Sequence, residues 1–71
     1  MANLYLYFNS REEYNRADDF FKYESDFQPM TSNDAFKCYI FEEEGNIDGL
    51  EMMLTDELSE NDFYDFYFAA E

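Results

Sequence analysis

The sequence has no histidine, no tryptophan, one cysteine, one proline and two glycines among its 71 residues. Without histidine, the side chain most often used for general acid–base catalysis is missing. The single Cys38 excludes an internal disulfide and is consistent with a reducing compartment. Gly45 and Gly49 do not have the spacing of a glycine-rich phosphate loop. The segment 1–4 has no basic region and no long apolar run, so we expect neither a signal peptide nor a membrane span.

Positive charge is also scarce. Eighteen Asp and Glu stand against four Lys and Arg, which gives a formal net charge of −14. A net charge of about 2–8 in magnitude keeps a small domain soluble, and the excess costs stability through self-repulsion. Such a chain is not expected to bind nucleic acid or anionic lipid directly. A halophilic source or drift would explain the excess without a function, whereas recognition of a strongly basic partner would explain it through one.

The acids are spread along the chain, and only Glu42–Glu44 form a run. A disordered acidic tail would be one block outside the fold, so we expect the folded surface itself to be negative. Nine Phe and seven Tyr supply enough apolar mass for one core. Residues 1–71 are therefore expected to form a single acidic domain.

Hydrophobic periodicity predicts six elements in the order strand, helix, strand, strand, helix, strand. The predicted elements are Leu4–Phe8, Arg11–Tyr23, an irregular edge strand over Asp26–Thr31, Ala35–Phe41, a helix with an apolar stripe from Ile47 through Met53 to Leu58, and Phe63–Ala70. Ser10 and Glu13 form a capping box, and Asn46 or Asp48 can cap the second helix. The pattern predicts an α+β class and a ferredoxin-like β-α-β-β-α-β fold, with two helices on one face of an antiparallel sheet. Without the second strand, a three-stranded layer would remain.

The opposite face of the predicted sheet is aromatic. In the predicted register it carries Tyr5, Tyr7, Tyr39, Phe41, Asp65 and Tyr67. RNA-recognition motifs stack bases on this face, but the chain lacks their basic strand signature. The face is better interpreted as a protein contact or a homodimer seam, unless a loop or terminus covers it.

Catalytic and metal sites have little support in the sequence. Cys38 lies in a predicted buried strand with no histidine to activate it. Paired acids such as Asp18 and Asp19 have no visible cleft to shift a pKa. The acidic stretch Asp56–Asp62 lacks the register of an EF-hand loop. We expect no enzyme, no metal and no cofactor.

The density of negative charge approaches that of DNA. A 71-residue globule is about 28 Å across, and about 28 Å of duplex carries roughly 16 charges. In size, lack of histidine, interspersed acids and abundant aromatics, the chain resembles phage-encoded DNA-mimic proteins, including anti-restriction proteins and acidic anti-CRISPR proteins. The resemblance rests on composition, and no motif carries it.

The resemblance implies a stoichiometric inhibitor that blocks the nucleic-acid-binding site of a host-defence nuclease or CRISPR effector. The expected compartment is the cytoplasm, which is that of the host if a phage encodes the chain. An acidic interaction module or homodimer that uses the sheet face remains the alternative. The residues expected to meet Lys and Arg of the partner are Glu12, Asp18, Asp19, Glu42, Glu43, Glu44, Asp48, Glu51, Glu57 and Glu60.

Overall fold

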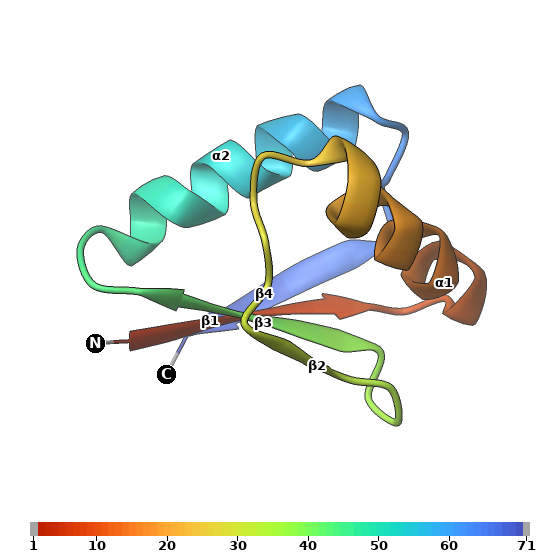
Figure 1. Ribbon diagram of the computed structural model, residues 1–71, viewed down its shortest axis with the longest axis horizontal. Coiled ribbons are helices and arrows are strands. Elements are labelled where there is room, and N and C mark those ends of the chain that lie inside the picture. Colours follow the sequence, from red (N-terminus) through yellow and green to blue (C-terminus); the bar gives the residue numbers. More distant parts are fainter. Residues whose placement is uncertain (1, 71) are drawn as a thin grey trace.

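The computed structural model describes residues 2–70 as a four-stranded antiparallel sheet with helices over one face (Figure 1). Its elements are β1 (Ala2–Phe8), α1 (Arg11–Asp19), the π-helical turn η1 (Phe20–Glu24), β2 (Thr31–Asn33), β3 (Cys38–Glu43), α2 (Ile47–Glu60) and β4 (Phe66–Ala70). The strand order is β2-β3-β1-β4. The predicted α+β class, with two helices and an antiparallel sheet, is confirmed.

The core lies between the sheet and the helices and is mostly aromatic. Along β1, Leu4, Leu6 and Phe8 point into it, as their alternation predicts. Tyr39 stacks on Tyr14 with ring centroids 4.8 Å apart, and its hydroxyl donates a hydrogen bond of 2.8 Å to the Tyr14 carbonyl. Among the described residues no charged side chain is buried, so the acids are all at least partly exposed.

The first helix begins as predicted and then widens. Ser10 caps α1 by accepting a hydrogen bond from the Glu13 N–H at 3.4 Å. At the other end, the Ser25 N–H reaches back five residues to the Phe20 carbonyl at 2.9 Å, which makes η1 a π-helical turn. Phe20 and its neighbour Phe21 are both buried there. The helical extent predicted from the sequence is therefore nearly right, but its last turn is not α-helical.

The hairpin between the two middle strands lies further along the chain than predicted. Pairing begins where the Met30 N–H donates to the Ile40 carbonyl, and β2 then runs from Thr31 to Asn33, past the predicted end of the strand at Thr31. The turn itself covers residues 34–37, is closed by a 3.2 Å bond from the Lys37 N–H to the Asp34 carbonyl, and places Lys37 at φ 54. Pro29 has no N–H to donate, which explains why pairing starts only after it.

The register of the sheet corrects the predicted aromatic face. Tyr39 pairs with Leu6 and Phe41 pairs with Leu4, so both rings share the inner face with those leucines. Their side chains are only 2% and 3% exposed. The prediction that Tyr39 and Phe41 face away from the helices is wrong.

The buried stripe of α2 contains fewer residues than predicted, and the last strand begins later than predicted. The Asn46 side chain caps α2 by accepting from the Gly49 N–H at 3.0 Å. Leu50, Leu54 and Leu58 are buried, but Met53 is 52% exposed and does not belong to the core stripe. Phe63 is buried ahead of β4 rather than within it, so the strand begins only at Phe66.

Candidate interaction surfaces

Helix α2 carries a row of acids along its solvent side. Asp48, Asp56 and Glu60 are exposed and, with the 69%-exposed Met52, occupy positions four residues apart. Residues at i, i+4 and i+8 lie above one another on a helix. We call these four residues the α2 row. Asp56 was not among the residues selected from the sequence, although its spacing from Asp48 and Glu60 is visible there.

The charge density of α2 matches one strand of DNA. The twelve residue steps from Asp48 to Glu60 span about 18 Å at 1.5 Å per residue. Five acids fall in that span, namely Asp48, Glu51, Asp56, Glu57 and Glu60, and no basic residue does. One DNA strand has a phosphate every ~3.4 Å, or about five in the same length. Counted around its whole circumference, the helix therefore carries carboxylates at about the density of phosphates, and three of the five, Asp48, Asp56 and Glu60, are exposed.

The acids of α1 are exposed but less uniform. Glu12 and Asp19 have no basic group within ion-pair distance among residues 2–70. Asp18 is 3.0 Å from Lys22, and this hydrogen-bonded contact raises the pKa of the Lys22 ammonium. Asp18 is thus partly neutralised within the chain.

The run Glu42–Glu44 is divided between the end of β3 and the bend that follows it. Glu42 and Glu43 are the last two residues of β3, so their side chains point to opposite faces of the sheet, and Glu44 lies in the following bend. The Glu43 carboxylate accepts a 3.0 Å hydrogen bond from the Gly45 N–H. The three acids therefore serve different surfaces.

Two glutamates are engaged inside the fold. The Ser25 hydroxyl donates a short hydrogen bond to Glu57, which ties η1 to α2. Glu13 was expected to complete the capping box, but its carboxylate instead accepts from the N–H groups of Tyr64 and Asp65 at 3.4 and 3.0 Å. Glu57 is consequently a weaker candidate for partner contact than its position on the helix suggests.

The ten acids selected from the sequence do not form a single patch. Glu42, Glu43, Glu44 and Asp48 belong to the segment where β3 leads into α2, whereas Glu57 and Glu60 belong to the other end of that helix. Figure 1 shows these two ends of α2 far apart. Glu51 lies between these ends and is partly buried. Only α2 connects the two acidic ends.

Few of these acids are neutralised internally. Within residues 2–70 the ion pairs are Arg11 with Asp34, Arg16 with Glu13, and Lys22 with Asp18. All of the other described carboxylates lack a basic partner within 4.0 Å, including those of the α2 row. Their charge is available to an external partner.

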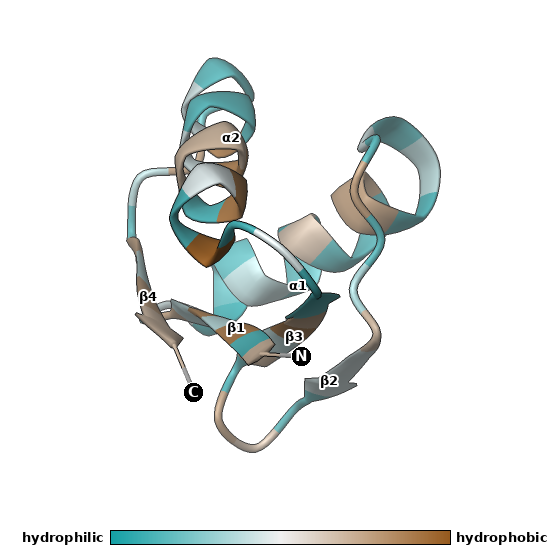
Figure 2. Cartoon of the chain, turned by 90° about the vertical axis from the view of Figure 1, so that its left-hand side faces the viewer, coloured by the Kyte–Doolittle hydropathy of each residue, from teal (hydrophilic) through white to brown (hydrophobic). Residues whose placement is uncertain are grey.

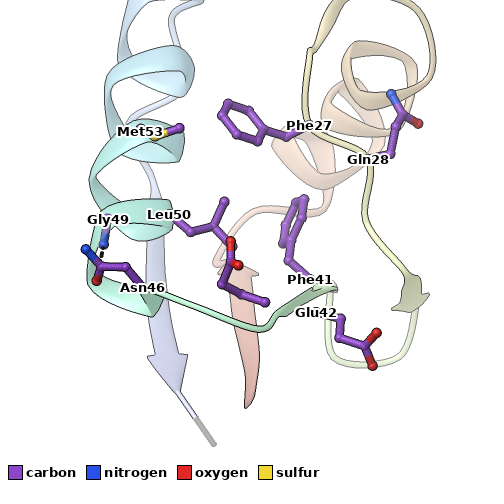
Figure 3. A pocket seen from close by; sticks show the side chains of 9 residues that line it. Phe27, Gln28, Phe41, Glu42, Asn46, Gly49, Leu50 and Met53 are labelled. Carbon is purple, nitrogen blue, oxygen red and sulfur yellow. Dashed lines mark hydrogen bonds between the residues drawn. The ribbon is translucent and has the colours of Figure 1, made fainter. Parts of the chain in front are cut away.

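A groove of about 410 Å³ opens between α2 and the segment that follows η1. Figure 2 shows these two parts standing apart above the sheet. Phe41 forms the floor, Leu50 and Met53 form one wall, and Phe27 points across the groove from the other side (Figure 3). Glu43 also lines it. We call this the α2 groove, an apolar slot bordered by acids.

The outer face of the sheet is aromatic and poor in charge. Tyr7 stacks on Tyr67 with ring centroids 5.0 Å apart, and Tyr67 and Phe36 are 50% and 67% exposed. The strand pairing places Tyr5 and Ile40 on the same side. Among residues 2–70, Glu42 is the one strand acid that the alternation directs to this face.

Comparison with known proteins gives no relative of this chain. No family model, no curated protein and no solved structure matches it. Among residues 2–70, no helix is long and apolar enough to cross a bilayer. The same residues contain no group of three or more side chains placed to hold a metal ion.

Proposed function

We propose that this protein is a non-enzymatic, stoichiometric inhibitor that imitates the charge of DNA and occupies the nucleic-acid-binding site of another protein. The observation that carries the proposal is the α2 row, where Asp48, Asp56 and Glu60 lie exposed on one side of a helix that has no basic residue. A groove that holds phosphates with Lys and Arg would meet these three exposed carboxylates in place of phosphates. Host-defence nucleases and CRISPR effectors in the cytoplasm are the proposed targets.

Several acids lie where they reduce the stability of α2, which supports a role for them in binding. Glu57, Glu60 and Asp62 crowd the C-terminal end of α2, where the helix dipole disfavours negative charge by roughly 0.3–1 kcal/mol each. Stability alone would favour Lys or Arg at these positions. Steering of a basic partner is a benefit that such acids provide.

We propose further that the fold is ferredoxin-like. The β2-β3-β1-β4 order supports this, because each helical connection joins two strands that flank a third. This arrangement keeps both helices on one face and leaves the other face open.

The test is capture from a host lysate at low salt, followed by elution with duplex DNA and mass spectrometry. Asp48→Asn/Asp56→Asn removes two charges from the α2 row, and Glu24→Gln/Asp26→Asn removes two charges from exposed positions outside it. We expect the wild type to capture a nucleic-acid-binding protein that duplex DNA elutes. The Asp48→Asn/Asp56→Asn variant should lose this capture, and the Glu24→Gln/Asp26→Asn variant should keep it. Equal capture by both variants, or no elution by DNA, would refute the proposal.

The outer sheet face supports a second candidate, a homodimer. Two chains of net charge −14 repel each other unless they meet through a face poor in carboxylates, and within residues 2–70 the strands direct one acid, Glu42, to this face. Tyr and Phe are enriched in such contacts. Sedimentation equilibrium of the wild type and of Tyr67→Ser decides the question. A wild-type dimer that Tyr67→Ser dissociates supports this candidate, and a monomer at all concentrations and salts refutes it.

A further inference from the structure

The α2 groove is adjacent to the α2 row. Met53 forms part of its wall and precedes Asp56 by three residues, so the two side chains are neighbours on the helix surface. Met53 is 52% exposed and Phe27 is only partly buried, although both are large apolar side chains. An apolar group placed between them would cover surface that now meets water.

The charges around the groove limit what can enter it. Glu43 lines the groove and accepts a hydrogen bond from the neutral Gly45 N–H, with no basic partner within 4.0 Å among residues 2–70. Glu42, which is exposed, lines the groove as well, and Asp56 is the helical neighbour of Met53 three residues further along α2. The neutral polar side chains that line the groove are already engaged, since Asn46 accepts from the Gly49 N–H and Gln28 donates to the Phe21 carbonyl at 2.6 Å. The groove therefore favours an apolar group flanked by positive charge.

We propose that the α2 groove receives one aliphatic side chain from a basic segment of the partner, while the flanking Lys or Arg residues contact Glu43 and Asp56. This inference rests on the proposed function, because the basic partner supplies the segment. Charge along the α2 row gives rapid association, and the buried side chain gives the complex its lifetime. Mimicry of phosphate charge alone would not discriminate among basic proteins, whereas the groove selects those with an apolar residue at the matching position.

The experiment uses the peptide acetyl-Gly-Arg-Leu-Arg-Gly-amide and amide chemical shifts of the isotopically labelled protein. We expect the peptide to change the amide chemical shifts of Gly49, Met53 and Glu43. Replacing its Leu by Ala should weaken binding roughly tenfold, which corresponds to losing most of the burial of one aliphatic side chain. Replacing both Arg by Glu should abolish binding.

The matched protein variants are Met53→Gln and Met52→Gln. Both change an exposed methionine of α2 to the same polar residue, but only Met53 lines the groove. Met53→Gln should weaken binding of the peptide several-fold, and Met52→Gln should leave the affinity unchanged. Thermal melts show whether both variants fold.

Equal affinity for the Leu and Ala peptides, or shifts confined to residues away from the groove, would overturn the groove proposal while leaving charge mimicry intact. Failure of DNA to displace any captured partner would instead refute the mimicry, whatever the peptide does. The two results are independent because the peptide assay contains no nucleic-acid-binding protein.

Discussion

The C-terminal end of α2 carries an acid where glycine would be favoured. The Phe63 N–H bonds the Leu58 carbonyl at 2.9 Å and the Asp62 N–H bonds the Ser59 carbonyl at 3.3 Å, which is a Schellman motif. Its left-handed residue is Asp62, with φ 67. We predict that Asp62→Gly stabilises the protein, because it relieves the backbone cost and removes a negative charge from the negative end of the helix.

The expected gain is about 1 kcal/mol. The charge contributes roughly 0.3–1 kcal/mol, and the backbone adds about 0.5 kcal/mol once the entropy of glycine in the unfolded chain is subtracted. For a domain of this size, 1 kcal/mol raises Tm by about 4–8 °C. Loss of the 3.2 Å bond from the Tyr64 hydroxyl to Asp62 is a small cost because both groups are exposed.

Thermal melts of three variants separate the two contributions. Asp62→Asn removes the charge, and Asn still tolerates the left-handed backbone, so this variant should show only the stability gained by removing the charge. That gain should be smaller in 1 M NaCl. Asp48→Asn makes the same change at the N-terminal end of α2, where the dipole favours the acid. Both variants relieve the repulsion among the acids to a similar extent. The difference between their Tm values therefore reports the interaction of the charge with the helix dipole. Equal shifts in these two variants, or a lower Tm for Asp62→Gly, would refute the reasoning.

The remaining predictions concern the core and its supports. Burial raises the pKa of Tyr39 above its ordinary 10.0, so stability should fall as pH rises past 10, and pH-dependent melts of Tyr39→Phe should show a shallower fall and a cost of about 1 kcal/mol at neutral pH. Arg16 donates to the carbonyls of Asn61 and Asp62 and lies 3.9 Å from the Phe63 ring centroid, so Arg16→Ala should cost about 1–2 kcal/mol in denaturant unfolding, and Arg16→Lys should recover less than half of it. Burial also raises the pKa of the Cys38 thiol, so a disulfide reagent at pH 8 should react far more slowly with the native protein than with the unfolded chain, and equal rates would contradict the structure.

Local signals predicted most of the architecture. The alternation along β1 allows only one face to be buried, the face of Leu4, Leu6 and Phe8. The Ser10 and Asn46 caps fix where the two helices begin. The face of β3 was ambiguous because both of its rows are apolar: Cys38 and Ile40 on one side, Tyr39 and Phe41 on the other. Only pairing with β1 decides between them.

The candidate site was less predictable, because its contacts join distant residues. Glu13 fits a local capping box, yet it bonds backbone groups of residues 64 and 65. Glu57 resembles any exposed helix acid until Ser25 approaches it from η1. The groove depends on where Phe27 lies relative to Met53, which periodicity does not give.

The shortage of internal ion pairs links folding to binding. Only Arg11, Arg16 and Lys22 neutralise acids within residues 2–70, so the free protein retains most of its self-repulsion. A basic partner of the proposed kind would relieve that repulsion, and by thermodynamic linkage it would raise the melting temperature of the chain it binds. Substitutions that remove acids would stabilise the free protein and weaken the complex at the same positions. Selection for a robust fold and selection for tight binding would thus oppose each other along α2, and a variant stabilised by removing these acids would bind such a partner more weakly.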